Sequence, residues 1–176
     1  MGLAGSGLLF VSCGGGKPPP IEGETAQPVG TPDDKGGTLT VSINEVALNH
    51  GNLFLRSNSS PFTGLVNDKW PNGILKYQCA YQGGKKHGPE LAWHEGGVKR
   101  MAAQFKDGNR EGQEQHWWPN GQIMSMETYL NGKPHGEAKG WHKDGKLART
   151  EKYEAGQKVG TSEGWWKNGN RADSTT

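Results

Sequence analysis

The chain has 176 residues, of which 31% are hydrophobic and 29 are glycine, and its formal net charge is +2. This length suits one ordinary domain or one repeat array with a tail. The nearly balanced charge excludes the dense basic surface typical of nucleic-acid-binding proteins. Two cysteines are too few for a disulfide framework and lack metal-ligand spacing, so we interpret Cys79 as a small buried side chain.

Residues 1–13 end in a short apolar run, residues 8–11, followed by Ser12 and Cys13. This segment resembles the end of a bacterial lipoprotein signal peptide, whose cysteine is acylated and becomes the mature N-terminus. The resemblance implies lipidation at Cys13 and a protein anchored to the cell envelope, on its periplasmic or outer-membrane face. Two alternatives stay open: N-myristoylation, whose pattern Gly2 and Ser6 fit, and a disordered terminus on a cytoplasmic protein.

Residues 14–37 contain five prolines among glycines and scattered charges, which predicts a disordered, extended tether. Residues 38–63 follow as an N-terminal capping hairpin. In this hairpin we expect residues 38–43 to form one strand and residues 53–55 to form its return strand. No stretch of the chain reaches the roughly 20 apolar residues of a membrane-spanning helix.

From residue 64 to residue 176 the sequence repeats every 24 residues without insertion or deletion. A glycine begins each unit, a second glycine follows nine residues later, and an aromatic residue follows seventeen residues after the first. A fixed period of this size indicates a repeat array in which each unit packs mainly on its neighbours. The recurring residues are Gly64, Gly88, Gly112, Gly136 and Gly160; Gly73, Gly97, Gly121, Gly145 and Gly169; and Tyr81, Phe105, Tyr129 and Tyr153.

Each unit holds two turn sequences such as Asn120-Gly121, which follows Trp118, and Asn131-Gly132. These pairs tolerate positive φ and favour tight hairpins. Two turns per unit predict two antiparallel strands, hence an all-β, elongated array of about five β-hairpin repeats that advances about 9.6 Å per unit. We expect the first glycine of each unit to mark a bulge within a strand.

In the second strand, alternation predicts one face shared by Leu75, Tyr77, Cys79 and Tyr81, and likewise by Lys99, Met101, Ala103 and Phe105. Stacked aromatic residues from equivalent positions are expected to form the spine of the array. Tryptophans with interleaved lysines are typical of surfaces that stack bases or sugars. Core packing is the favoured interpretation of the tryptophans, since they recur at a fold position.

The unit G-x-x-x-x-W-x-x-N-G … Y-x-x-G-K-x-x-G resembles the bacterial variant class of MORN repeats. Residues 49–64 resemble the lead-in common in proteins labelled YwqK-type antitoxins, so the resemblance covers residues 49–176. It implies a β-hairpin repeat scaffold whose targets are protein partners or phospholipid surfaces. The antitoxin label further implies a scaffold that neutralises a toxin in the cytoplasm.

The histidines do not indicate a metal site. His87 and His135 share one repeat position, His94 and His142 share another, and each pair is two repeats, about 19 Å, apart. Ligands of one zinc ion lie within about 2.1 Å of it. Because no phosphate-binding loop or catalytic motif accompanies them, we expect no enzymatic activity, no cofactor and no bound metal.

Two function hypotheses follow. The first is a non-enzymatic scaffold that binds a protein partner, such as a toxin, through an exposed face or a strand edge. The second is an envelope-anchored lipoprotein whose repeats bind anionic phospholipid or the envelope surface. Its motives are the 17 Lys and Arg against 13 Asp and Glu in residues 64–176, and the basic residues near turns: Lys85, Lys86, His87, Lys99, Arg100 and Lys133.

Overall fold

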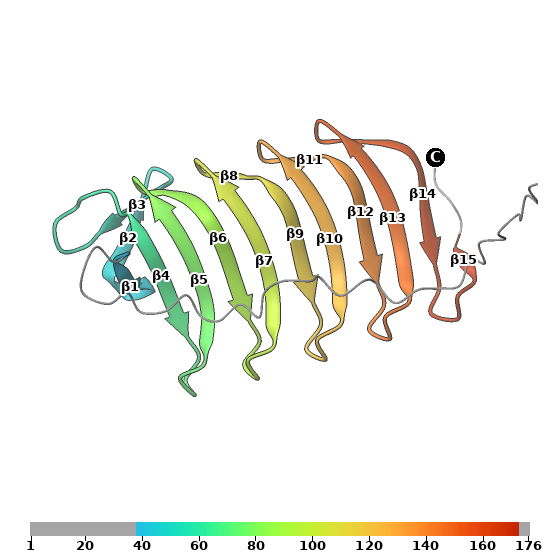
Figure 1. Cartoon of the computed structure of the whole chain (residues 1–176), viewed down its shortest axis with the longest axis horizontal. Helices are drawn as coiled ribbons and strands as arrows, with labels where there is room; N and C mark the ends of the chain where they lie inside the picture. The colour runs from blue at the N-terminus through green and yellow to red at the C-terminus, as the bar shows by residue number, and fades with distance from the viewer. Residues whose placement is uncertain (1–37, 173–176) are drawn as a thin grey trace, which may run out of the picture. The chain divides into compact units, whose positions relative to one another are not determined.

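The computed structural model describes residues 38–172 and confirms the predicted all-β class (Figure 1). Thirteen strands form one sheet, and two further strands form a small separate sheet. The described residues contain no α-helix, and so no helix long and apolar enough to cross a membrane. Cys13 and the predicted tether, residues 14–37, lie outside the described part of the chain.

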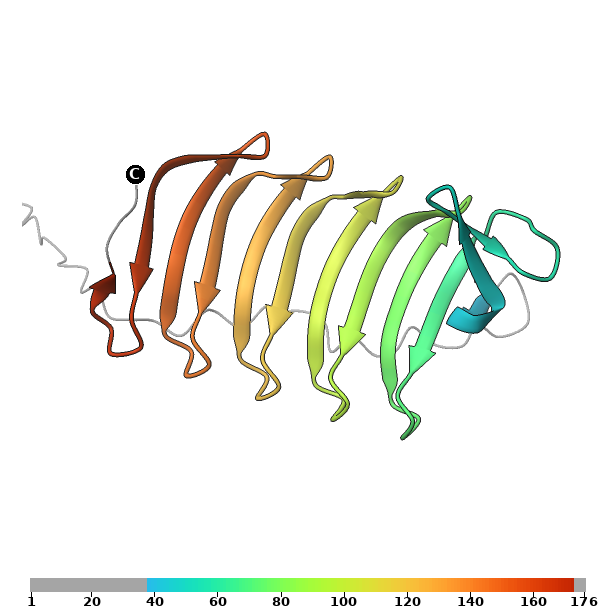
Figure 2. The same ribbon diagram turned by 180° about the vertical axis from the view of Figure 1, so that it is seen from behind.

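Neighbours in the large sheet follow almost strictly in chain order (Figures 1 and 2). Five successive hairpins, one per 24 residues, are formed by β4–β5, β6–β7, β9–β10, β12–β13 and β14–β15. Short strands β8 and β11 extend the pairing of β7 and β10. The strands are β1 (Thr40–Ser42), β4 (Gly64–Lys69), β5 (Leu75–Gln82), β6 (Lys85–Trp93), β7 (Lys99–Lys106), β8 (Asn109–Arg110), β9 (Gly112–Trp117), β10 (Ile123–Leu130), β11 (Lys133–Pro134), β12 (Gly136–Trp141), β13 (Leu147–Glu154), β14 (Gln157–Trp165) and β15 (Arg171–Ala172).

The N-terminal hairpin differs from the predicted one. It is formed by β2 (Val46–Asn49) and β3 (Asn52–Leu55), whereas β1 leaves it and pairs in parallel with β4. The cause is a short 3-10 helix, η1 (Ile43–Glu45), which Ser42 and Glu45 close with a reciprocal capping box. Since this cap ends β1 at Ser42, the return strand finds its partner in the following segment.

The apolar core lies at this N-terminal end. Val41, Val46, Leu53, Phe62 and Val66 form one buried cluster, and Tyr81 packs against it. The rings of Phe62 and Tyr81 meet edge to face with centroids 6.2 Å apart. The cap therefore supplies the buried area that a single hairpin repeat lacks.

Both turn types contain the predicted glycine at positive φ, but only the upper turns have positive φ at both central residues. The two-residue upper turns, at the top of Figure 1, place a residue with φ near +50° before a glycine, as in Asp107-Gly108. This is the primed hairpin geometry that Asn-Gly and Asp-Gly pairs favour. In the lower turns, Gly121 N donates to Trp118 O at 2.8 Å, and Asn120 Oδ1 accepts from Gln122 N at 3.2 Å.

The glycine at the head of each repeat pairs with the recurring aromatic residue of the same repeat. Register pairs join Gly64 with Tyr81, Gly88 with Phe105, Gly112 with Tyr129 and Gly136 with Tyr153. These glycines have positive φ, and pairing is irregular beside Gly88, between Cys79 and Tyr81 of the neighbouring strand. The predicted bulge is thus present, and the seventeen-residue spacing is a cross-strand pair.

The register defines two faces of the sheet. One row of paired residues runs across the strands. Four tryptophans lie two residues after a member of this row in the same strand, and since side chains alternate along each strand, they lie on the same side of the sheet as the row. We call this side the tryptophan face. The row is Gln78, Leu91, Ala102, Gln115, Met126, Lys139, Thr150 and Glu163, and the tryptophans are Trp93, Trp117, Trp141 and Trp165.

The opposite side, which we call the glutamate face, contains the cross-strand pairs Cys79–Glu90, Glu90–Ala103, Glu114–Glu127 and Ala138–Glu151. The recurring aromatic residues also lie on this face, but the expected ring-on-ring spine is wrong. Two strands separate successive rings by about 9.6 Å, beyond the roughly 4.5–7 Å of an aromatic pair. The intervening strand fills the gap with Lys86, Arg110, Pro134 and Lys158.

A bulge beside each lower turn changes the predicted face of two residues. Ala92 pairs with Met101, but the next residue, Trp93, pairs with Lys99, so one residue of β7 is extra. This extra residue reverses the alternation and places Lys99 on the tryptophan face. Leu75 is displaced in the same way. The prediction that both share a face with the buried residues of their strands is therefore wrong.

Candidate binding surface

Ring nitrogens link each lower turn to the next repeat. Trp70 Nε1 donates to Trp93 O at 3.2 Å, and Trp118 Nε1 donates to Trp141 O at 3.3 Å. His94 and His142 occupy the same position in the intervening repeats, and their Nε2 atoms lie 3.0 and 2.8 Å from the carbonyls of Trp117 and Trp165. Because a carbonyl only accepts, each Nε2 carries a proton, and this histidine position is a structural donor.

Two further histidines, His87 and His116, are each paired with a single carboxylate. His87 Nδ1 lies 3.3 Å from Asp107 Oδ1, and His116 Nε2 lies 2.8 Å from Glu114 Oε1. Among residues 38–172, no group of three or more His, Cys, Asp or Glu side chains is placed to hold a metal ion. These histidines therefore form separate polar contacts along the sheet.

Several polar groups of the glutamate face pair with one another. Tyr77 donates to Glu90 Oε1 at 2.7 Å, and the same carboxylate pairs with Lys86. In the fourth hairpin, Tyr153 donates to Glu151 Oε2 at 3.1 Å and Lys158 Nζ lies 3.3 Å from Glu151 Oε1. Lys86 also lies over the Phe105 ring. The carboxylates are consequently engaged by the scaffold itself.

Burial and these contacts shift the pKa values of several groups on the glutamate face. Burial, with a hydrogen bond to Glu127, raises the pKa of Tyr129 to about 12, and burial raises the pKa of the Cys79 thiol. For Glu114, burial opposes ionisation, yet the hydrogen bond to His116 and the charge of Arg110 outweigh it and lower the pKa. At neutral pH the Cys79 thiol therefore stays protonated and Glu114 stays ionised.

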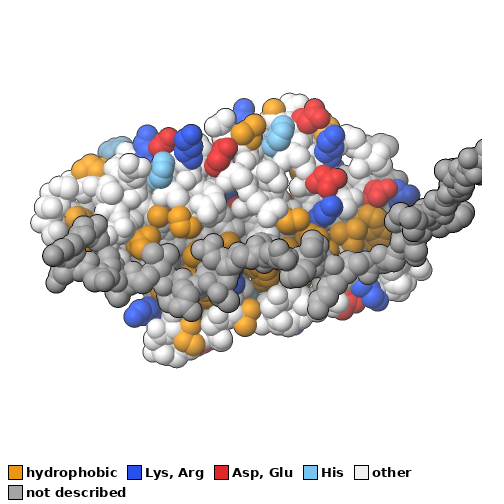
Figure 3. Space-filling view, in the orientation of Figure 1, with side chains coloured by type: hydrophobic (Ala, Val, Ile, Leu, Met, Phe, Trp, Pro, Cys, Tyr) orange, Lys and Arg blue, Asp and Glu red, His pale blue; other side chains and the backbone are white. Residues whose placement is uncertain are grey.

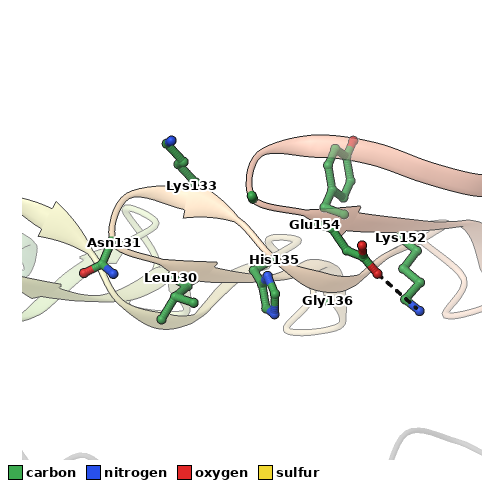
Figure 4. Close-up of a pocket in the computed structure, with 9 residues that line it drawn as sticks. Leu130, Asn131, Lys133, His135, Gly136, Lys152 and Glu154 are labelled. Atoms are coloured by element: carbon green, nitrogen blue, oxygen red, sulfur yellow. Dashed lines mark ion pairs between the residues drawn. The ribbon is translucent and has the colours of Figure 1, made fainter.

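Two shallow grooves open between upper turns above the aromatic residues. The first has a volume of about 620 Å³ and is lined by Leu130, Tyr153, Lys133, His135 and Lys152, among others. Figure 4 shows Lys133 on the opposite side of the ribbon from His135 and Lys152, and Lys152 pairs with Glu154, 4.0 Å away. The groove thus lacks a convergent set of polar groups, and we do not assign a small-molecule site to it.

The basic residues predicted near turns are only partly free. Lys86 pairs with Glu90, His87 with Asp107, and Lys99 Nζ lies 5.5 Å from the centre of the Trp117 ring. Figure 3 shows one face of the molecule, on which charged and histidine side chains gather along the upper turns with hydrophobic side chains below them. Basic and acidic side chains alternate there, which weakens the case for an anionic surface as the target.

Among the described residues, the tryptophan face carries large rings whose polar groups make no hydrogen bond. Trp93, Trp117, Trp141 and Trp165 are all half-buried and repeat with the 24-residue period. No hydrogen bond between described residues uses their indole N–H groups, whereas those of Trp70 and Trp118 are bonded. These four donors are also not among the buried polar atoms left unpaired. The described residues therefore leave these four indole donors unused.

Sequence reasoning did not separate these four tryptophans from those of the lower turns. The signal was present, because both positions recur every 24 residues. What identifies the second position as a surface row is strand alternation, which puts it on the side opposite the recurring aromatic residues. The predicted scaffold residues themselves lie in turns, bulges and cross-strand pairs, as described above.

Comparison with known proteins supports the repeat class. The family model described as "MORN repeat variant" matches residues 110–131 and 134–155. No curated protein matches the chain. One solved structure, described as "Crystal structure of accessory secretory protein 1,2 and 3 in Streptococcus pneumoniae", aligns with 76% of this chain at 13% identity and a TM-score of 0.33. The aligned region spans 23% of that other chain, and a likeness this low bears on neither fold nor function.

Proposed function

We propose that the protein is a non-enzymatic repeat scaffold that binds a protein partner through the tryptophan face. The observation that carries this proposal is the row of four tryptophans at the repeat period, whose indole donors are unused by the described residues. Tryptophan is enriched among the residues that dominate binding energy at interfaces. The match of two repeats to the MORN repeat variant model favours the same class of function.

The face is a better candidate than the sheet edge. Among described residues, β15 pairs with β14 only at Gly164 and Trp165, so part of β14 lies at an edge. That strand has a register irregularity opposite Thr150–Lys152 and carries Lys158. Bulges and lysines are the devices that keep edge strands from accepting another strand. We therefore place the partner on the face.

The predicted antitoxin role is a finer version of this proposal, in which the partner is a toxin. The predicted envelope anchor at Cys13 would instead place the scaffold outside the cytoplasm. Acyl labelling of the native protein separates these situations: a lipoprotein loses the label on Cys13→Ala substitution. Label that survives the substitution contradicts lipidation at Cys13.

Affinity capture from the native source tests the proposed surface. Trp117→Ala and Gln113→Glu both alter the tryptophan face, the second at an exposed position where the fold tolerates a charge. We expect each to lose a stoichiometric partner that the unaltered chain retains. The matched control is Trp166→Ala, which removes a 63% exposed tryptophan at a lower turn. A partner retained by both face variants, or lost only with the control, contradicts the proposal.

Fewer basic residues than predicted support the phospholipid hypothesis. Lys85, Lys133 and Arg100 have no ion pair among the described residues, unlike Lys86 and His87. Binding that depends on such charges weakens as salt rises. Sedimentation with anionic vesicles at low salt, reversed at high salt, would support lipid binding, whereas a chain that stays in the supernatant removes this alternative.

A further inference from the structure

We propose that the segment recognised by the tryptophan face is a proline-rich stretch of the partner in the polyproline II conformation. This inference rests on the proposed function and specifies the chemistry of its partner. Proline-rich segments dock in grooves lined by aromatic side chains, because their extended conformation is preformed and little entropy is lost on binding. Spacing, hydrogen bonding and charge on the tryptophan face favour this occupant.

The spacing of the tryptophans matches the polyproline helix. Two strands per repeat place equivalent residues about 9.6 Å apart along the array. A polyproline II helix rises about 3.1 Å per residue with three residues per turn, or about 9.3 Å per turn. Every third residue of such a helix therefore meets the next tryptophan. Trp93, Trp117, Trp141 and Trp165 together span about three turns.

The hydrogen-bonding groups are complementary as well. A proline has no N–H group, and a polyproline II helix has no internal hydrogen bonds, so its carbonyls need donors from the surface that binds it. The tryptophan face offers four indole N–H groups unused by the described residues. The amides of Gln78 and Gln115 in the adjacent row already donate to Asn67 Oδ1 and Gln113 Oε1. An incoming β-strand would bring N–H groups that the face of a sheet cannot satisfy, because the sheet's own carbonyls are used in its ladder.

The charge of this face also fits an uncharged ligand. Glu137 Oε2 lies 2.8 Å from Lys139 Nζ, and Glu163 Oε1 lies 2.6 Å from Arg171, so these charges cancel in pairs. Lys99 covers the Trp117 ring at 5.5 Å, where it can move aside for a proline ring or remain as a further donor. The uncharged members of the row are Gln78, Leu91, Ala102, Gln115, Met126 and Thr150, and they repel neither proline nor its carbonyls. The charged members, Lys139 and Glu163, belong to the two ion pairs above.

The indole N–H signals of the full chain in a proton–nitrogen NMR spectrum test the proposal directly. The probes are synthetic oligoprolines of six and twelve residues, with a Gly-Ser dodecapeptide as control. Dodecaproline is expected to shift the signals of Trp93, Trp117, Trp141 and Trp165. The signals of Trp70 and Trp118, which already donate to carbonyls, are the internal control and are expected to stay in place.

The length of the peptide and substitution of a tryptophan provide two further tests. Because twelve prolines engage two more tryptophans than six do, the dodecapeptide should bind at least about tenfold tighter, a difference of about 1.4 kcal/mol. Trp117→Phe keeps a ring but removes its donor, and should weaken dodecaproline binding several-fold while Trp166→Ala leaves it unchanged. Equal binding of the two lengths, or equal shifts with the Gly-Ser peptide, overturns the proposal.

Failure of this inference is distinguishable from failure of the proposed function. If dodecaproline shifts none of the four face signals while capture of the native partner still depends on Trp117, the polyproline chemistry is wrong and the binding face stands. If neither oligoproline binding nor partner capture depends on the tryptophan face, both proposals are wrong.

Discussion

At the scale of single residues, the alternation of tryptophan and histidine at the lower turns has a simple cause. Both rings carry an N–H group at the distance needed to reach a carbonyl of the next repeat, as Trp118 does to Trp141 O and His142 does to Trp165 O. What the position requires is a donor on a flat ring. An aromatic ring without a donor does not meet this requirement.

Substitutions at His142 test this requirement. His142→Trp keeps the donor and should leave the free energy of unfolding nearly unchanged, because Trp118 occupies the same position one repeat earlier. His142→Phe leaves the carbonyl of Trp165 without its donor and should cost about 1 kcal/mol. Denaturant titration of the two variants measures the difference, and equal stability of both contradicts the role of the ring N–H.

A second residue-scale prediction concerns Ala155 in the last complete upper turn. Its φ is +49°, and the corresponding first turn positions are held by Gly83, Asp107 and Asn131. An alanine in the left-handed region is strained, whereas asparagine and glycine tolerate it. Ala155→Asn should therefore stabilise the protein by about 1 kcal/mol, seen as a higher Tm, and Asn131→Ala should lower the Tm by a similar amount. An unchanged or lowered Tm for Ala155→Asn would contradict the strain.

At the scale of strands and hairpins, the polar groups of the glutamate face contribute to stability in a pH-dependent way. Glu114 is held between His116 and Arg110, with Arg110 Nε 2.7 Å from Glu114 Oε2 as an ion pair without hydrogen-bond geometry. Its pKa is lowered on folding, because these contacts outweigh the opposing effect of burial. Ionised Glu114 therefore stabilises the fold above its unfolded pKa of about 4.3, and this contribution disappears as pH falls through the lower folded value.

The prediction is that Glu114→Gln destabilises the protein at neutral pH and loses less stability than the unaltered chain on acidification below about pH 4.3. Thermal unfolding across that range measures it. Glu95→Gln, at an exposed lower turn, serves as the control and should follow the unaltered chain. Parallel acid profiles for Glu114→Gln and the unaltered chain would show that Glu114 plays no such part.

The sequence was sufficient to predict the elements because its signals are local. Asn131-Gly132 and its equivalents determine turns by their own backbone preferences, and the glycine such as Gly112 marks the bulge opposite its aromatic partner. The 24-residue period then orders identical hairpins without any long-range information. The all-β array follows from these features alone.

The parts that were mispredicted depend on neighbours in space. Whether Phe105 contacts another ring or Lys86 depends on how many strands separate the recurring rings, which is a property of the assembled sheet. The face of Lys99 depends on a bulge that adds one residue on one strand, a shift that period-two reasoning does not detect. The departure of β1 to pair with β4 required knowledge of the cap at Ser42.

At the scale of the whole described array, the two faces have different roles. On the glutamate face, carboxylates, tyrosines and cations contact one another and so hold the repeats together. The tryptophan face repeats large rings with donors that the described residues do not use. Contacts on the glutamate face therefore stabilise the scaffold, and we assign the tryptophan face to the partner.

Site-specific photo-crosslinking in the native cell tests this assignment most directly. A photoreactive amino acid at Gln113 lies on the tryptophan face at an exposed position, and one at Arg149 lies on the glutamate face with its native side chain 51% exposed. The account predicts a single discrete adduct from position 113 and none from position 149. An adduct from position 149 alone, or no adduct from position 113, would contradict the tryptophan face as the binding surface.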